Sequence, residues 1–163
     1  CSAGETVNRL GTTNAPQEPA TYAALAALVR DILDPVMDYF GGIQITYGFA
    51  GPDLTRAVPR NNAPEIDQHA GYELNTRGNR ICRRGGAAVD FLVPDEDMAE
   101  VAAWVAENTP FDRLYYYGDD RPVHVSSGPE GKKEIVAMKV TKNGRWTPLR
   151  VKHQSDLFRK SIK

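Results

Sequence analysis

The chain has 163 residues, of which 41% are hydrophobic and 25% charged, and its formal net charge is −1 at neutral pH. This length and composition are typical of one globular domain with a hydrophobic core. No apolar run reaches the ~18 residues that a membrane-spanning helix needs, so no such span is expected.

The first segment, residues 1–18, is predicted to be a linker or the partial edge of a larger protein from which the chain was excised. Cys1 would also be the first residue of a mature bacterial lipoprotein, which is the alternative. Cys82 is the only other cysteine, and two cysteines are too few for a disulfide framework. A reducing compartment is therefore favoured, and we expect a cytoplasmic protein.

The first predicted helix covers residues 19–34. Pro19 stands where the first turn of a helix tolerates proline, and Leu25 and Leu28 fit the spacing of one helix face. Pro35 is expected to kink or divide the helix, because proline has no backbone N–H to donate.

The next part of the chain alternates in character. Residues 43–49 alternate β-branched and polar side chains as a strand does, and residues 52–58 suggest a short helical turn. Residues 59–85 contain proline, asparagine, glycine and arginine with little periodicity, which predicts a long loop or an insertion. Loops of this length inside a compact domain tend to be functional.

The second half of the chain is predicted to be richer in strands. Residues 87–93 indicate a strand, and residues 95–108 an amphipathic helix with acidic residues on its first turn. The further predicted strands are 112–117, 122–126 and a hairpin of 133–140 with 144–151. This order predicts an α+β fold, a small antiparallel sheet with helices on one face. The domain is expected to span residues 19–151, followed by a basic tail, 152–163.

Asp90 is the one carboxylate in the predicted strand 87–93. An unpaired carboxylate among apolar groups costs roughly several kcal/mol, so a charged Asp90 needs a cation, several hydrogen-bond donors or a metal ion beside it. An ion pair with an arginine such as Arg84 is one interpretation, and metal ligation is the other.

Two of the three histidines can accompany Asp90. His124 alternates with two valines on a predicted strand, so its side chain points away from theirs. His69 lies in the long loop that leads to Asp90. Two neutral imidazoles and a carboxylate, with an open fourth position, make a suitable catalytic zinc site. The hypothesis is therefore a zinc site of His69, Asp90 and His124.

The stretches "GGAAVDF" and, further on, "VHVS" resemble the zinc DD-carboxypeptidases and hedgehog-like peptidases, whose pattern is S-x-H-x-x-G-x-A-x-D and a later histidine. Upstream, "IQITYGFAGPDL" is similar to the strand and turn I-T-S-G-Y-R-S of that family. The resemblance covers roughly residues 20–128 and places Gly86, Ala88 and Asp90 at G-x-A-x-D, with His124 as the last ligand. It implies a small α+β zinc hydrolase, a peptidase or amidase, with a peptide or peptidoglycan-like substrate.

The first histidine of the family pattern falls on Arg83 here, and arginine does not bind zinc. His69 stands fourteen residues earlier and can take this role if residues 70–84 are an insertion that loops out and returns. Its context, "DQHAG", keeps a polar residue before the histidine, much as the family does. Cys82 is the rival third ligand.

The family's general base is commonly a glutamate three residues before the last histidine, where this chain has Arg121. Asp120 and Glu73 are the candidate substitutes, and a base must lie within roughly 3 Å of the attacking water. The family's arginine for the substrate carboxylate is replaced by Ala50. The candidate substrate-binding residues are Arg56, Arg83 and Arg121.

Residues 131–163 contain ten basic and two acidic side chains. Such a segment can follow a phosphate backbone, although a solvated β-hairpin surface with a tail explains the same charges. The alternative function is a non-catalytic binding module that keeps the fold and associates with nucleic acid, within a larger DNA-modification or defence protein.

Overall fold

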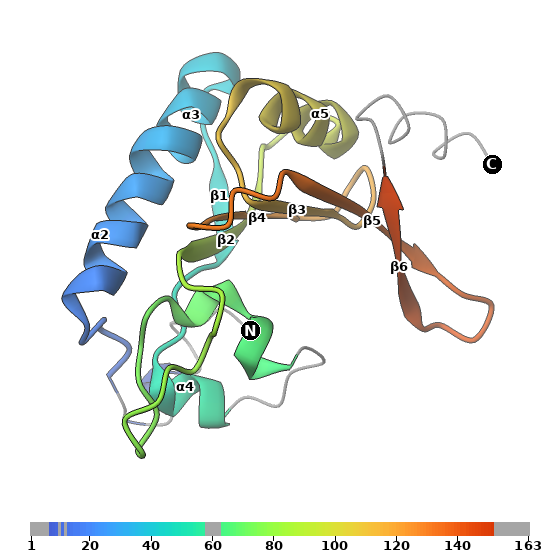
Figure 1. Ribbon diagram of the computed structural model, residues 1–163. Helices are drawn as coiled ribbons and strands as arrows, with labels where there is room; N and C mark the ends of the chain where they lie inside the picture. The colour runs from blue at the N-terminus through green and yellow to red at the C-terminus, as the bar shows by residue number, and fades with distance from the viewer. Residues whose placement is uncertain (1–6, 10, 12, 58–62, 152–163) are drawn as a thin grey trace.

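The computed structural model describes residues 7–9, 11, 13–57 and 63–151. One six-stranded sheet runs through the molecule (Figure 1), and its strands lie in the order β1 (Gln44–Tyr47), β2 (Ala87–Leu92), β4 (Val123–Ser127), β3 (Arg113–Tyr116), β5 (Glu134–Val140) and β6 (Trp146–Val151). The sheet and its helices confirm the α+β class. The predicted basic tail, with His153, lies outside the described residues.

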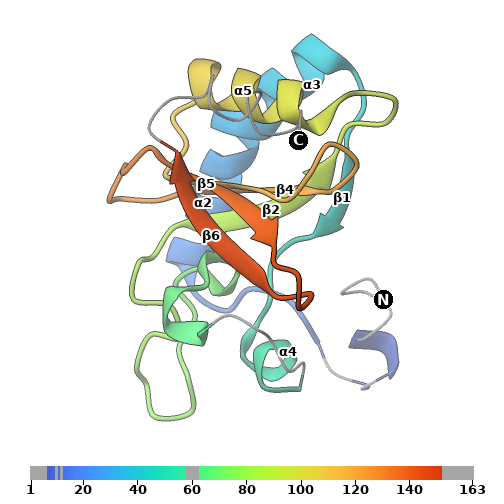
Figure 2. The same ribbon diagram turned by 90° about the vertical axis from the view of Figure 1, so that its right-hand side faces the viewer.

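The helices α2 (Pro19–Leu28), α3 (Asp34–Phe40) and α5 (Met98–Asn108) cover one face of the sheet. The other face carries the segment that contains α4 (Pro52–Ala57), as two views at right angles show (Figure 1, Figure 2). None of the described helices is long and apolar enough to cross a membrane.

The prediction that Pro35 kinks or divides the first helix is confirmed in part, because the α-helix is interrupted directly before this proline and then continues to Phe40. Between α2 and α3 the backbone makes one π-helical turn, η1 (Val29–Leu33), and Pro35 lies in the first turn of α3. Proline is tolerated in a first turn because its missing N–H would have no partner there. The local distortion is therefore a π turn, and the helical path continues to Phe40.

The hydrophobic core lies between the helices and the sheet. Alternate strand residues point to opposite faces, and those on the helix side are buried together with the inner faces of α2, α3 and α5. Phe91, Leu114 and Val125 are completely buried there. Burying a side chain such as Phe91 stabilises the fold by roughly 1.5–3 kcal/mol. Asp90 and His124 alternate with these residues, so both lie on the opposite face.

The sheet is mainly antiparallel, as expected, but one of its strand pairs is parallel. Strand β5 pairs with β3 in parallel, with Glu134 opposite Arg113. The end of β4 lies beside the start of β3, where Ser126 pairs with Arg113, and the short segment 128–133 crosses from there to the free side of β3. Strand β5 consequently starts at the same end as β3.

Residues 63–86, which we call the cover, lie over the face of the sheet opposite the helices (Figure 1). We call this the site face, because Asp90 and His124 lie on it. The segment was predicted as a loop, and it contains two 3-10 turns, η2 (Pro64–Ile66) and η3 (Gln68–Ala70), and a bridge between Leu74 and Arg80. It enters β2 through Gly86, where φ is +88° and an added Cβ would lie 2.0 Å from the Ser127 carbonyl oxygen. Only glycine fits there.

Candidate metal centre

Asp90, His124 and His69 bring their polar atoms together on the site face of the sheet. Asp90 and His124 are direct cross-strand neighbours on β2 and β4, and His69 reaches them from η3 in the cover. His124 Nδ1 lies 2.7 Å from Asp90 Oδ1, and His69 Nε2 lies 3.2 Å from both atoms. Within the described residues, this His-Asp-His cluster is the one group of three side chains suited to a metal ion.

The imidazole of His69 is fixed by its surroundings. Its Nδ1 lies 2.9 Å from the Gly48 carbonyl oxygen and therefore donates to it. The other ring nitrogen, Nε2, faces Asp90 and His124; it carries a proton when it donates to the Asp90 carboxylate and a lone pair when it binds a metal ion. The Asp67 carboxylate accepts a hydrogen bond from the His69 backbone N–H. A backbone carbonyl on the far nitrogen is the usual support for a metal-bound histidine.

The Asp90 carboxylate stays ionised in this setting. Burial opposes its charge, but hydrogen bonds and the charge interaction with His124 and His69 outweigh that effect, so the pKa of Asp90 lies well below its usual range. Arg84 does not accompany it, because this guanidinium donates to the Ile66 carbonyl instead. The arginine pair considered for Asp90 is therefore wrong, and its partners are histidines.

The spacing of the three atoms fits a tetrahedral metal ion. Zinc ligands at about 2.0–2.2 Å from the ion stand roughly 3.3 Å from one another. The two separations of 3.2 Å are close to that value, and the third, 2.7 Å between His124 Nδ1 and Asp90 Oδ1, is a hydrogen-bond distance that would have to lengthen around an ion. Two imidazoles and one carboxylate leave one position open, as in catalytic zinc sites. The residues present thus fit zinc.

Cys82 and Arg83 do not join the cluster. Cys82 is completely buried, burial raises the pKa of its thiol, and its sulfur is not part of the group of three ligand atoms. Arg83 is exposed on the cover. The segment between His69 and Asp90 runs through the cover and then enters β2.

Glu73, one of the candidate bases, is committed elsewhere. Its side chain is buried and accepts hydrogen bonds from the backbone amides of Gln17, at 3.1 and 3.2 Å, and Glu18, at 3.1 Å. These amides immediately precede helix α2, so Glu73 caps that helix from a distance. The structure does not bring Glu73 to the cluster.

The other candidates also lie outside the cluster. Asp120 is exposed in the turn between β3 and β4. Arg56 pairs with Asp53 at 3.3 Å and lines a separate hollow beside α4. Arg121 is exposed, and its guanidinium lies over the ring of Trp146. None of the three predicted substrate-binding arginines is among the residues that line the cleft described next; Arg121 contacts one of those residues, Trp146.

A cleft of about 610 Å³ opens beside His124, between the sheet, the cover and β6. Tyr115 and Tyr117, which the sequence analysis did not single out, both line this cleft, and Tyr115 packs its ring against that of His124 at 5.2 Å. Trp146 lines it from β6. The alternation of strand residues was the available signal, since it puts both tyrosines on the face of His124.

The chain was compared with models of protein families, with curated proteins and with solved structures, and none of them matched it.

Proposed function

We propose that this chain is a zinc-binding domain of the DD-carboxypeptidase and hedgehog-like type, with His69, Asp90 and His124 as ligands, and that it acts as a metal-dependent hydrolase of the peptidase or amidase class. The observation that carries the proposal is the convergence of three ligand atoms within 3.2 Å of one another. The G-x-A-x-D resemblance and the histidine on the later strand β4 support it.

The chemistry assigned to the site follows from its ligand set. Bound zinc lowers the pKa of a coordinated water to about 7 and polarises a carbonyl group. The chain contributes a fixed His69, an ionised Asp90 and a cleft that begins at His124. Asp67 lines the cleft and accepts a hydrogen bond from the His69 backbone N–H at 3.1 Å, and this position beside a ligand makes it our candidate for moving the proton.

Metal analysis of the purified protein tests the proposal. We expect about one zinc per chain after incubation with zinc and extensive dialysis, and a loss of at least about tenfold in zinc affinity for His124→Ala and Asp90→Ala, because each change removes a ligand. Asp120→Asn is the matched control, an exposed carboxylate outside the cluster that should leave zinc in place. A cluster held together only by hydrogen bonds predicts no zinc in any of these proteins, and that result would sink the proposal.

The second candidate function is nucleic-acid binding, and one observation favours it. The hairpin of β5 and β6 exposes Lys139, Lys142 and Arg145 near its turn, and none of the three has an ion pair among the described residues. Such cations can contact phosphates. Salt-dependent binding of labelled single-stranded or duplex DNA would support this function, and no binding at low salt would exclude it.

A further inference from the structure

We propose that the cleft beside the His-Asp-His cluster selects peptides with a large apolar or aromatic side chain, which packs against Tyr117, Met138 and Trp146. The inference rests on the proposed function, because it assigns a substrate preference to the same site. It concerns residues of β3, β5 and β6, beyond the three ligands.

The cleft starts at the cluster and follows one row across the sheet. Asp90 pairs with His124, His124 with Tyr115, Tyr115 with Val136 and Val136 with Arg150. Neighbouring strands lie about 4.8 Å apart, so the row extends roughly 14 Å beyond His124. An extended peptide of about four residues spans that distance. A peptide bond at the cluster would therefore place nearby side chains over β3, β5 and β6.

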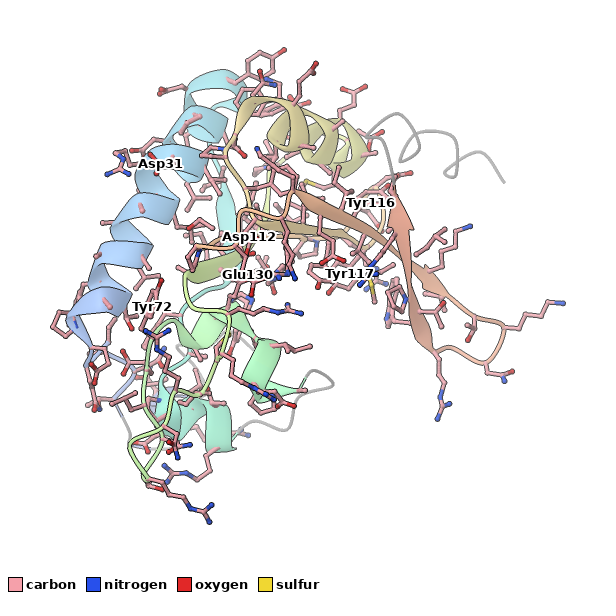
Figure 3. The ribbon with its side chains drawn as sticks, viewed as in Figure 1. Asp31, Tyr72, Asp112, Tyr116, Tyr117 and Glu130 are labelled. Atoms are coloured by element: carbon pink, nitrogen blue, oxygen red, sulfur yellow. The ribbon has the colours of Figure 1, made fainter. Side chains whose placement is uncertain are left out.

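Next to this row the cleft has an apolar and aromatic wall. Tyr117, Met138 and Trp146 all line it. The Tyr117 ring meets the Trp146 ring edge to face at 5.6 Å, and Arg121 lies over the Trp146 ring at 5.7 Å, so the indole is held in place. Tyr117 lies on the opposite side of the sheet from Tyr116 (Figure 3). Aromatic surfaces of this kind bind apolar side chains with little loss of conformational entropy.

The charges of the cleft favour an uncharged side chain over a polyanion. Besides the tyrosines and His124, two cationic and two anionic side chains line the cleft, namely Arg84, Arg150, Asp67 and Glu134. Glu134 is held between Arg150, at 2.7 Å, and the buried Arg113, at 3.5 Å. The positive charges of Arg84 and Arg150 are thus balanced by the carboxylates of Asp67 and Glu134. A groove that binds nucleic acid needs an excess of cations.

Binding of blocked peptides tests the inference. The probes are fluorescein-labelled alanine peptides that carry one central phenylalanine, alanine or glutamate, titrated into the zinc-loaded full chain and followed by fluorescence polarisation. We expect the phenylalanine peptide to bind at least about tenfold more tightly than the other two. Trp146→Ala should lose this preference. Leu149→Ala is the matched control, because Leu149 is 37% exposed, like Trp146 at 38%, but lies on the opposite face of β6.

Other outcomes overturn the inference. Equal affinity for the three peptides would show that the wall does not select, and so would an equal loss in Trp146→Ala and Leu149→Ala. Tyr117→Ser provides a second removal of the wall, should Trp146→Ala unfold. Binding of labelled oligothymidine that Trp146→Ala abolishes, without peptide selectivity, would assign the cleft to nucleic acid instead. Zinc content measured on the same samples separates this inference from the proposed function, since the wall variants should keep their zinc.

Discussion

Asp90 is charged on the site face because the imidazoles of His124 and His69 lie beside its carboxylate. Burial alone would favour its neutral acid, but His124 and His69 hold its pKa well below the usual range. The charge acts on its neighbours in turn. Burial raises the pKa of Tyr117 to about 12, and the Asp90 carboxylate contributes to the same shift. The pKa of Tyr117 therefore depends on the charge of Asp90.

Tyr117 should titrate late in the zinc-free protein. Its pKa in the folded protein lies above the usual value of about 10, so the neutral phenol stabilises the fold fully below about pH 10, and this contribution is lost as the pH rises towards 12. Absorbance of tyrosinate in the near ultraviolet measures the step. Tyr117→Phe should remove it, and Asp90→Asn should move it to lower pH, because an anion has gone. A late step that persists in Tyr117→Phe would contradict the assignment.

For individual residues, the sequence analysis identified the three members of the cluster but not the contacts that hold them in place. The cost of burying a carboxylate identified Asp90, and the strand alternation correctly oriented His124. Glu73 was assigned to the wrong surroundings, because its partners are backbone amides of residues 17 and 18. Contacts of that range depend on the path of the cover, and no local pattern encodes this path.

The elements divide the molecule by function. Helices α2, α3 and α5 form the core with one face of the sheet, and the cover places His69 over the other face. Glu73 links the cover to the start of α2. The N-cap residue of α2, Glu18, makes no capping hydrogen bond with its own side chain. The cap therefore comes from the cover, and it ties the position of the cover to the helix layer.

Glu73→Gln should destabilise the fold and leave zinc binding intact. In the variant, the N–H₂ group of the glutamine side chain replaces one acceptor oxygen and faces backbone N–H groups, which are also donors. A buried donor left without an acceptor costs about 1–3 kcal/mol. Urea unfolding measures the change in the free energy of unfolding. Glu18→Gln is the control, with a change within about 0.5 kcal/mol, because its side chain makes no cap. If the variant lost zinc or hydrolytic activity while its free energy of unfolding stayed unchanged, Glu73 would have a role at the metal site, contrary to this prediction.

Periodicity predicted most of the elements, since it reflects which side chains are buried. It did not predict how they pair. The parallel pairing of β5 with β3 follows from a crossing of only six residues, 128–133, and nothing in the alternation of β5 says which neighbour it has. The π turn before Pro35 was missed for a related reason, because the prediction considered the proline alone and not the turn before it.

The whole molecule is a sheet between a helical layer and the cover (Figure 2). Two ligands of the proposed metal ion, Asp90 and His124, belong to the sheet, and the third, His69, belongs to the cover. The His69 ring donates from Nδ1 to the Gly48 carbonyl oxygen, and the Ala50 backbone N–H donates to the His69 carbonyl oxygen, so His69 is anchored to the segment after β1. A bound ion would therefore act as a cross-link between two layers of the fold.

Zinc should stabilise the whole domain through that cross-link. An ion that binds the folded state alone adds about 2.7 kcal/mol at a concentration one hundred times its Kd. For a chain of this size, the Tm should rise by roughly 5–10 °C. Differential scanning calorimetry with and without zinc measures the shift, and hydrogen exchange of residues 63–86 should slow at the same time, since His69 then holds the cover to the sheet. Asp90→Asn keeps the shape of the side chain but weakens the ligand, so most of both effects should vanish. A zinc-induced rise in Tm of equal size in Asp90→Asn would place the ion elsewhere on the chain.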